Sequence, residues 1–481
     1  MTVGGGRSRS AYWLPGWPLM LLGSLALGAI SLLVLPRSIA YDPWSWLIWG
    51  REIIHLHLDT RLAATSVKPL AIAFDTVFAL FGTSAAPALW LVVARAATVL
   101  SLVLAYRLAA RLGGPAAGLV AAIGLAASNQ FLAYLLVQGM SEPMAAAAVL
   151  AAIDLYVDGR RRWALVALLA AAWLRPEAWP FLICYLLWLA WPGSWLRRWI
   201  ALAVGMFVPF SWFLIDWFGA RQFNRSANAA SHQSQGGPLL SREPGLATVR
   251  ETWKLLSAPV EILFVIGFLV AVWMWWRDAR SNASVWLGLG ALGWLVVDAV
   301  LAQGHFATGA PRYLLPGDAL ACVVVGVFVS DLLRWVRHSR LGSRDALAAA
   351  GLVCVVLALW LLPRAITLGR QVRTGVHSGR LAVRLENALP RAIALAGGRA
   401  AIERCGPVNT QRFQVPLVAW HLDVPVGTIG IVPTPTGTVF QISRAPRVLE
   451  NERSSYHYRG VVGPAVAQWT VLSTCAPPPA G

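Results

Sequence analysis

The sequence predicts an all-α polytopic membrane protein with about eleven spanning helices, followed by a small α/β domain on the extracytoplasmic side. Three observations support this fold class. Of the 481 residues, 57% are hydrophobic and only 13% are charged, and the mean hydropathy is +0.61, which lies outside the range of soluble globular domains. The apolar residues fall into runs long enough to cross a bilayer. Arginines recur in alternate loops between these runs.

The strongly basic balance of the chain does not indicate a nucleic-acid partner. The formal charge is +18, but a nucleic-acid-binding protein shows its basic residues as a stripe on a soluble face, with stacking aromatics nearby. Here the arginines separate apolar runs, and the 25 tryptophans are typical of rings that collect at the membrane–water interface. Lys68 and Lys254 are the only lysines among 40 cationic residues, so each invites a specific explanation.

The first apolar run, from about residue 12 to 35, follows Arg7 and Arg9. We interpret it as a spanning helix and not as a signal peptide, because it is long enough to cross the bilayer, no small-residue cleavage site follows, and more spans come after it. The remaining spans are expected at approximately 84–106, 116–136, 141–157, 163–175, 177–192, 199–217, 257–276, 284–302, 313–333 and 346–363.

Arginine placement predicts the topology. If the N-terminus is cytoplasmic, alternate loops should carry the cationic residues, and five internal loops do so. An odd number of spans then places the tail outside the cytoplasm. We therefore expect a multi-pass protein of the cell (plasma) membrane, with a transmembrane domain over residues 1–363, a first extracytoplasmic loop at about 36–83, and an extracytoplasmic domain over 364–481. The loop arginines are Arg107 and Arg111, Arg160 to Arg162, Arg197 and Arg198, Arg277 and Arg280, and Arg334, Arg337, Arg340 and Arg344.

The tail is expected to be a small α/β unit. Residues near 377–397 have helical apolar spacing, whereas "RAAIERC" and "AQWTVLSTC" have the pattern of strands that end in cysteine. An exported domain would make Cys405 and Cys475 a plausible disulfide pair, although sequence does not supply the required geometry. No catalytic cluster is evident in this region.

The first outside segment carries the most informative charged residues. Asp42 follows the first span, an amphipathic aromatic stretch with Arg51 and Glu52 comes next, and Lys68-Pro69 ends the segment. Such a stretch lies along the membrane interface instead of crossing it. The alternative is a structural re-entry loop with ordinary solvated charges, in which Glu52 only pairs with Arg51.

Three further outside turns are polar where packing alone does not demand it. Charged groups at membrane depth cost roughly 2.5–3.5 kcal/mol each, so they usually face a wet cavity or a partner. Acidic residues beside cations at one membrane face suggest a site for an anionic lipid head group and a nucleophilic acceptor. Alternatively, Arg175 pairs with Glu177, Arg312 caps its helix, and His305 makes an ordinary hydrogen bond. The turns are "QGMSEP" with Glu142, "WLRPEAWP" with Arg175 and Glu177, and "QGHFATGAPRYLLP" with His305, Arg312 and Tyr313.

Three elements in this order resemble the GT-C superfamily of polyprenyl-phosphate-dependent glycosyltransferases, particularly the branch of the protein mannosyltransferases and the lipid A aminoarabinose transferase. Asp42 follows the first span, Lys68-Pro69 precedes the run "LFGTSAAPALWLVVARAATVLSLVLAYRLAARLGG", and "RYLLP" from Arg312 opens a late helix. The likeness covers roughly the first 335 residues. The chain departs from that branch at Pro43, Leu70 and Glu142, where an acid, a proline and an aspartate are common.

The resemblance implies a GT-C-like fold and inverting transfer of a sugar from a polyprenyl-phosphate donor to an extracytoplasmic acceptor, which would be a cell-envelope glycan, lipid or protein. Asp42 resembles the general base, and Lys68 matches the lysine that contacts the donor phosphate. One carboxylate suffices for a single inverting displacement.

The other charged residues complete the expected site. Arg175 and Arg312 are candidates for the phosphate because guanidinium forks match phosphate oxygens, and Tyr313 could hydrogen-bond the same group. Glu142, which aligns loosely with a second acidic position of the family, is assigned to the acceptor or to a cation, and Glu52, Glu177 and His305 are auxiliary candidates. No cofactor is expected. No metal-ligand spacing is evident, and the need for a divalent cation stays open.

Two other function classes were weighed against the glycosyltransferase. Asp298 lies inside an expected span and is the kind of acid that marks proton relays, which favours a secondary transporter or lipid flippase. Transporters usually show repeated halves, and no such repeat is evident here. A structural or sensory protein that displays the tail would leave the charged loops unexplained. The sugar and the acceptor are not identified by the sequence.

Overall fold

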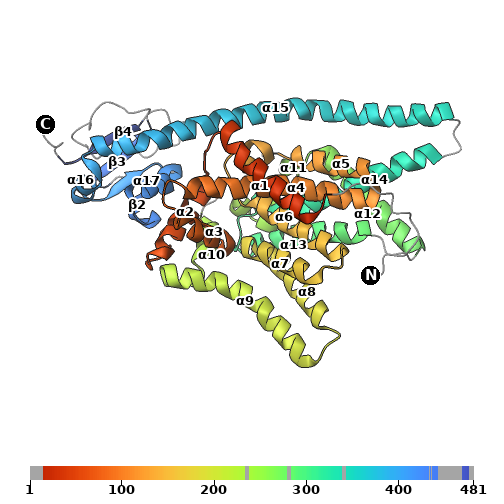
Figure 1. Cartoon of the computed structure of the whole chain (residues 1–481), viewed down its shortest axis with the longest axis horizontal. Helices are drawn as coiled ribbons and strands as arrows, with labels where there is room; N and C mark the ends of the chain where they lie inside the picture. Colours follow the sequence, from red (N-terminus) through yellow and green to blue (C-terminus); the bar gives the residue numbers. More distant parts are fainter. Residues whose placement is uncertain are drawn as a thin grey trace. The chain divides into compact units, whose positions relative to one another are not determined.

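Apolar, alanine- and leucine-rich sequence gives this chain a predominantly helical structure (Figure 1). The computed structural model describes residues 15–129, 131–232, 238–278, 283–338, 343–432, 434, 436–442 and 469–475. Arg7, Arg9, Arg280 and Arg340, which contributed to the topology prediction, lie outside the described residues. The α-helices are α1 Trp17–Val34, α2 Tyr41–Ile54, α3 Pro69–Ala79, α4 Ala86–Gly113, α5 Pro115–Ala126, α6 Glu142–Val157, α7 Arg161–Leu174, α8 Trp179–Ala190, α9 Trp195–Ala220, α10 Arg225–His232, α11 Pro244–Leu255, α12 Ala258–Asp278, α13 Ala283–Gln303, α14 Leu315–His338, α15 Ser343–Leu395, α16 Gly398–Cys405 and α17 Val415–Leu422.

Short elements connect these helices and form one small sheet. The strands occupy β1 Val408–Thr410, β2 Ile429–Gly430, β3 Thr438–Ile442 and β4 Trp469–Ser473. The chain also contains a π-helical turn, η1 Phe131–Leu136, and 3-10 turns η2 Pro176–Ala178, η3 Pro238–Leu240, η4 Pro311–Leu314, η5 Arg412–Gln414 and η6 Val426–Thr428.

The chain forms two compact units, each built from separate stretches of sequence. Unit 1 comprises Met1–Val34, Val92–Phe210 and Ala230–Gly375, and unit 2 comprises Leu35–Leu91, Ser211–Ala229 and Val376–Gly481. Helix α15 runs unbroken for 53 residues, so the domain boundary expected at residues 363/364 falls inside a helix. That boundary stays a prediction.

Six of the described helical segments are long and apolar enough to cross a membrane. The expected number of about eleven is not confirmed, because several helices are short: α7 has 14 residues and α8 has 12. At 1.5 Å per residue, such helices rise only about 18–21 Å, against about 30 Å of hydrocarbon core. The six segments are Trp17–Val34, Ala86–Gly113, Trp195–Ala220, Ala258–Arg277, Ala283–Gln303 and Pro311–Val336.

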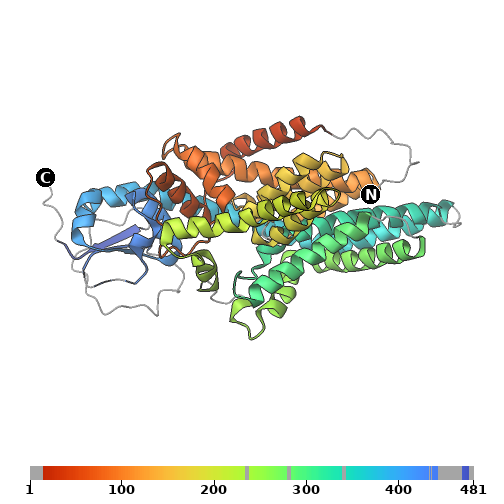
Figure 2. The same ribbon diagram turned by 90° about the horizontal axis from the view of Figure 1, so that it is seen from below.

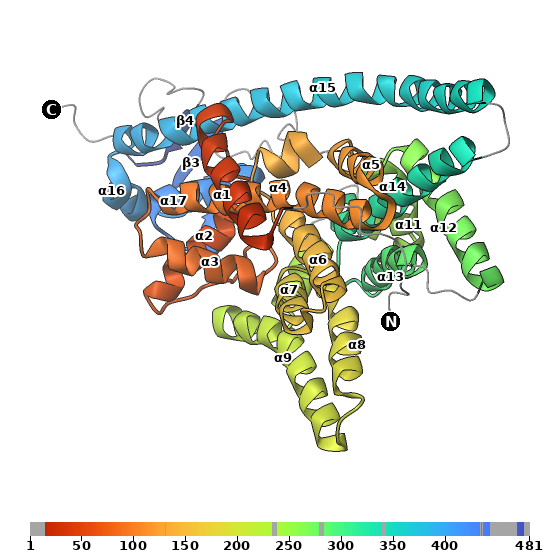
Figure 3. The same cartoon turned by 45° about the vertical axis from the view of Figure 1, so that its right-hand side comes forward.

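Small residues let the helices of unit 1 approach one another closely. Helix α5 packs on α14, α6 on α7, and α13 on α14 (Figure 3). At Gly326 in α14, an added Cβ would lie 2.3 Å from the carbonyl oxygen of Ala117 in α5. Only glycine allows that approach, as in the small-residue contacts that hold helices together in membranes.

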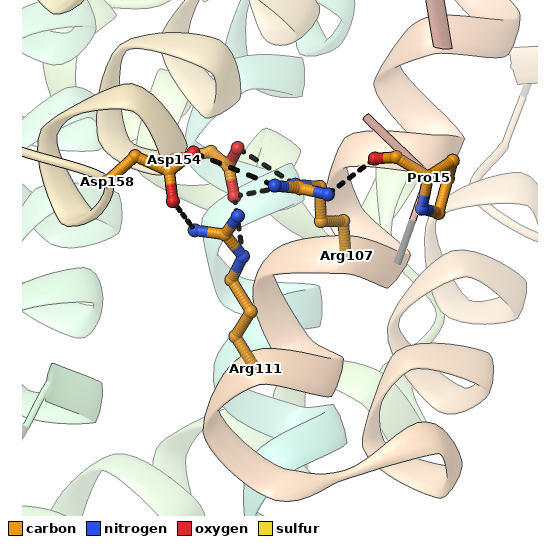
Figure 4. A network of polar contacts seen from close by, with 5 residues as sticks. All are labelled: Pro15, Arg107, Arg111, Asp154 and Asp158. Atoms are coloured by element: carbon orange, nitrogen blue, oxygen red, sulfur yellow. Dashed lines mark hydrogen bonds and ion pairs between the residues drawn. The ribbon is translucent and has the colours of Figure 1, made fainter. Parts of the chain in front are cut away.

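A buried ion-pair network joins helices α4 and α6 in unit 1, as Figure 4 shows. Arg107 Nε donates to both oxygens of Asp154 at 3.2 and 3.0 Å, and Arg111 Nη1 donates to Asp158 at 2.7 Å. Arg107 Nη1 also donates to the carbonyl oxygen of Pro15 at 2.6 Å, which ties in the start of α1. Asp154 is fully buried, and Arg111 Nε also lies 3.2 Å from its carboxylate. Its two arginine partners compensate the desolvation of its charge.

The sheet of unit 2 has the strand order β2-β1-β3-β4. Strand β1 is parallel to both β2 and β3, and β3 pairs with β4 in antiparallel register, with Phe440 opposite Val471. Figure 2 shows these strands in blue beside the light-blue helices of the tail. Trp469 in β4 is buried, and its indole donates to the carbonyl oxygen of Leu385 in α15 at 2.8 Å. The expected small C-terminal α/β unit is therefore present.

One of the two expected strands in the tail was wrong. The segment "RAAIERC" is helix α16 and not a strand. It buries Ile402 and Cys405 at a spacing of three residues, and Arg399 pairs with Glu403 one helical turn later at 2.6 Å, so the helical period wins in this short run. The strand expected in "AQWTVLSTC" is confirmed as β4. Cys405 and Cys475 form a disulfide.

Candidate functional site

Asp42 lies in the first turn of α2, where Pro43 suits the helix start and an acidic side chain is favoured by the helix dipole. Its carboxylate accepts a hydrogen bond from the Thr65 hydroxyl at 3.4 Å, and Thr65 also contacts Ser45, one turn along α2, at 2.9 Å. Asp42 is only partly buried. These contacts hold the carboxylate at the start of α2 and leave it accessible.

Lys68 precedes α3 and packs against α2. Its side chain is almost wholly buried, and Nζ lies 4.8 Å from the centre of the Trp46 ring, a cation–π contact. Trp46 is fully buried and donates through its indole nitrogen to the carbonyl oxygen of Ser66 at 3.1 Å. Trp46 is four residues after Asp42, so both side chains lie on the same face of α2. The predicted base and the predicted phosphate-binding lysine therefore lie on the same side of this helix.

A strap from the segment after α9 fixes the loop that carries Thr65 and Lys68. Arg225 donates to the carbonyl oxygens of Ala63 and, at 2.6 Å, of Thr65. Ser226 Oγ accepts from Val67 N at 2.9 Å and donates to Asp216 at 2.8 Å. These residues were missed in the sequence. Asp216 lies near the end of the span expected at 199–217 and Arg225 just beyond it, about 160 residues after the loop that they hold, so local pattern gave no signal for them.

Burial shapes the electrostatics of the strap. Arg225 is 5% exposed, and desolvation lowers the pKa of its guanidinium to about 10. Its side chain also stacks over Trp49, with Cζ 5.3 Å from the ring centre. At neutral pH the guanidinium stays charged, so it continues to bind the two loop carbonyls.

Arg51 and the tail hold the far end of α2. The Arg51 guanidinium forms an ion pair with Asp423 at 3.0 Å, donates to the carbonyl oxygen of Trp420 at 3.1 Å, and stacks on the Trp420 ring at 4.7 Å. Trp44 packs against the same ring at 5.6 Å. We call these four residues the α2–α17 latch. Glu52 points elsewhere: its Oε2 accepts from the Asp59 amide at 2.9 Å.

Glu52 should make stability depend on pH. It is 1% exposed, and burial raises the pKa of its carboxyl from 4.5 to about 8. A carboxyl whose pKa is higher in the folded than in the unfolded chain favours folding when protonated, fully below about pH 4.5, and this contribution is lost as the pH rises through about 8. We expect the unfolding temperature to fall as the pH rises from 5 to 9. The corresponding loss in the free energy of unfolding is at most about 4 kcal/mol.

The Glu52→Gln variant should lose most of that pH dependence in thermal unfolding. Glu403→Gln is the matched control, because Glu403 is half exposed and pairs with Arg399 on the surface of α16. Equal pH slopes in the parent and Glu52→Gln would contradict the assignment.

Unit 1 contains a second group of charged residues, built around Arg175, which lies between the end of α7 at Leu174 and the turn η2 that begins at Pro176. Arg175 is 3% exposed and forms a bidentate pair with Glu177, at 3.0 Å from Nε and 2.5 Å from Nη2. Its Cζ lies 3.6 Å from the centre of the Tyr313 ring. Glu142, in the first turn of α6, approaches Arg175 Nη1 at 3.9 Å and Arg312 Nε at 3.4 Å. The structure thus brings these five predicted residues together.

Asp298 and His305 differ in their relation to this cluster. Asp298 is fully buried in α13 and interacts electrostatically with Glu177 and Arg175. The cluster therefore contains three carboxyl groups and two guanidinium groups. His305 is exposed in the turn after α13, at a left-handed φ of 59°.

The described residues show no candidate metal centre: no three His, Cys, Asp or Glu side chains within them come close enough together to hold an ion. The Asp42 carboxylate faces the Thr65 hydroxyl, and the carboxylates of the unit 1 cluster face Arg175 and Arg312.

Comparison with solved structures identifies the fold. ArnT from Cupriavidus metallidurans in the apo state superposes with a TM-score of 0.52 over 96% of this chain and 98% of that chain, at 13% sequence identity. ArnT bound to undecaprenyl phosphate superposes with a TM-score of 0.51 at 14% identity, with the same coverage. The chain has the GT-C fold. No protein-family model and no curated protein sequence matches it.

The GT-C likeness extends beyond the region that the sequence motifs cover. The resemblance of motifs reaches roughly residue 335, whereas the structural match includes 96% of the chain. At 13% identity the match shows the arrangement of the backbone and not the chemistry of the side chains. The function must therefore be argued from Asp42 and Lys68 in unit 2 and from the cluster in unit 1.

Proposed function

We propose that this protein is an inverting GT-C glycosyltransferase that moves a sugar from a polyprenyl-phosphate donor to an extracytoplasmic glycan, lipid or protein of the cell envelope. One observation supports it most: Asp42, a half-buried carboxylate, lies on the same face of α2 as Trp46, and the buried Lys68 ammonium contacts the Trp46 ring. These two groups would supply the base and the phosphate contact that such a transfer needs. Solved ArnT bound to undecaprenyl phosphate has the same fold.

The proposed reaction is a single displacement. The acceptor hydroxyl oxygen forms a bond to the anomeric carbon as the bond from that carbon to the donor phosphate oxygen breaks. Asp42 takes the hydroxyl proton, and the lipid phosphate leaves with the bonding electron pair. One displacement inverts the anomeric centre. The Thr65 hydroxyl, which donates to Asp42, would orient the carboxylate for this step.

We assign the donor phosphate to Lys68, with Arg312, Arg175 and Tyr313 as supporting residues. In the unit 1 cluster the carboxyls outnumber the guanidinium groups, so the cluster alone is poorly suited to an anion. Arg175 already binds Glu177 through two nitrogens and would mainly position its neighbours. Arg312, whose side chain is 25% exposed, has the better access to a phosphate oxygen. Glu142, Glu52, Glu177 and His305 remain the proposed acceptor or auxiliary residues.

We also propose the membrane arrangement that this reaction requires. The chain would sit in the plasma membrane with a cytoplasmic N-terminus, about eleven membrane-embedded helices within residues 1–363, and an extracytoplasmic tail over 364–481. In this arrangement the loop at about 36–83, which carries Asp42 and Lys68, faces outward. The charged arginine loops between the other helices support it.

Transfer from a synthetic polyprenyl-phosphate sugar to envelope acceptors tests the proposal directly. We expect Lys68→Ala to lower kcat/KM by about 10–100-fold, because a charge-assisted contact to the phosphate contributes about 1.5–3 kcal/mol. Lys254→Ala is the matched control, since the other lysine of the chain is 64% exposed and pairs with Glu251. Equal loss in both variants, or full activity in Lys68→Ala, would remove the phosphate assignment. Solute transport that depends on Asp298 would instead favour a transporter.

A further inference from the structure

Five arginines and several exposed tryptophans gather at one end of helices α6, α7 and α8. Arg160 precedes α7, Arg161 and Arg162 begin it, and Arg197 and Arg198 lie in the first turn of α9. The start of α7 is held against α8: Tyr185 in α8 donates to the carbonyl oxygen of Arg161 at 3.1 Å. We call this region the Arg/Trp end of unit 1.

The two sequence segments that carry these arginines contain no acidic residue next to them. Residues 159–176 and 178–215 contain no aspartate or glutamate. The nearest carboxylates before the first segment, Asp154 and Asp158, are already paired with Arg107 and Arg111 (Figure 4). A group of cations with no acid among them favours an anionic partner.

Tryptophan rings orient two of the arginines. Cζ of Arg161 lies 5.1 Å from the centre of the Trp188 ring, and Cζ of Arg198 lies 4.6 Å from that of Trp191. Arg198 also donates to the carbonyl oxygen of Trp191 at 2.9 Å. A stacked guanidinium keeps its plane fixed and presents its N–H groups at the edge, which suits the oxygens of a phosphate.

The same residues line two surface hollows. One, of about 150 Å³, is lined by Arg161, Trp188, Leu189, Trp191 and Pro192. The other, of about 450 Å³, is lined by residues 159–163, namely Gly159, Arg160, Arg161, Arg162 and Trp163. Arg161 belongs to both. In the first hollow a guanidinium group can contact a phosphate, and the indole rings beside it offer an apolar surface for acyl chains.

Exposed tryptophans place this end at a membrane interface. Trp163, Trp191, Trp195 and Trp199 are 57–70% exposed, and amphipathic rings with that exposure are typical of the head-group level of a bilayer. The occupant is therefore a lipid and not a soluble anion.

We propose that the Arg/Trp end of unit 1 binds the phosphodiester head group of an anionic phospholipid, such as phosphatidylglycerol. This site is separate from the unit 1 cluster around Arg175, because Arg161 begins α7 and Arg175 follows its end. Fourteen residues of helix put about 21 Å between them. A lipid bound there would fix the depth and tilt of α6, α7 and α8 in the membrane.

Photo-crosslinking in nanodiscs of phosphatidylcholine tests this site with the full-length chain. A photoreactive phosphatidylglycerol probe should label peptides from residues 159–163 and 188–199. The double variant Arg161→Gln with Arg198→Gln should raise the probe concentration needed for half-labelling by about 30-fold, as expected for the loss of two interfacial cations. Arg161→Lys with Arg198→Lys should give an intermediate shift, because the charge stays but the planar fork is lost.

Matched measurements decide the outcome. Arg242→Gln with Arg250→Gln removes two exposed arginines elsewhere and should leave labelling unchanged. Unchanged thermal unfolding of all variants shows that folding is intact. Three results would overturn the proposal: equal labelling by a phosphatidylcholine probe, parent-like labelling of the glutamine double variant, or labelling of these peptides only by a polyprenyl monophosphate probe.

Discussion

Asp42→Asn is expected to slow sugar transfer by about 10²–10⁴-fold, the usual contribution of a positioned general base. Asparagine keeps the size of the side chain and can still accept from the Thr65 hydroxyl, so the loop should stay in place. It cannot take the proton of the attacking hydroxyl. The effect should therefore appear in kcat, with the KM for the donor little changed. Turnover of a radiolabelled polyprenyl-phosphate sugar measures it.

Asp59→Asn serves as the control for this result. Asp59 lies in the same outside segment and pairs with the exposed Arg61 at 2.6 Å, and such surface pairs contribute little. It should retain nearly full activity. A parent-like kcat in Asp42→Asn would refute the proposed base, even if Lys68→Ala remained impaired.

Arg175→Met should destabilise the protein by about 3–5 kcal/mol, because it removes the cation that compensates buried carboxyl groups. Glu177 and Glu142 are 0% and 1% exposed, and Asp298 interacts with the same arginine. Without the guanidinium, these acids would share a desolvated space with Arg312 as the nearby cation. We expect a lowered midpoint of thermal unfolding in detergent.

Arg334→Met provides the comparison, since Arg334 pairs with Asp331 on the exposed surface of α14. Its loss should shift the midpoint by the equivalent of less than about 1 kcal/mol. The double variant Arg175→Met with Glu177→Leu should recover part of the stability, because it removes a stranded charge together with its partner. Similar midpoints of thermal unfolding for Arg175→Met and Arg334→Met would show that the buried Arg175–Glu177 pair does not stabilise the fold more than a surface pair does.

The sequence predicted those parts of the fold that depend on local pattern. Apolar runs located most of the helices. Asp42 begins the amphipathic stretch expected after the first span, which is α2, and Glu142 begins the span expected at 141–157, which is α6. The strand expected at "RAAIERC" failed because seven residues carry too little periodicity to separate a strand from two helical turns. The number of spans could not be fixed because turns such as Arg175-Pro176 divide apolar sequence into pieces shorter than a bilayer.

Contacts between distant residues were not predictable from the pattern. Arg225 binds Thr65, 160 residues earlier, and Arg51 binds Trp420, 369 residues later. Hydrophobic periodicity reports only which residues are neighbours along one element. It therefore cannot predict the contacts of Arg225 with the loop or of Arg51 with α17. Arg175 with Glu177 was weighed as a local pair because only one residue separates them, and the structure shows that pair.

The α2–α17 latch bears on how this protein can be shortened. A chain that ended before the sheet would lack Trp420, which packs against Trp44, and Asp423, which pairs with the Arg51 guanidinium. In such a chain α2 would expose the Trp44 ring, and the Arg51 guanidinium would lose its ion pair. Attempts to express a shortened chain should therefore retain the tail through residue 475, because Cys475, just after β4, forms a disulfide with Cys405 of α16.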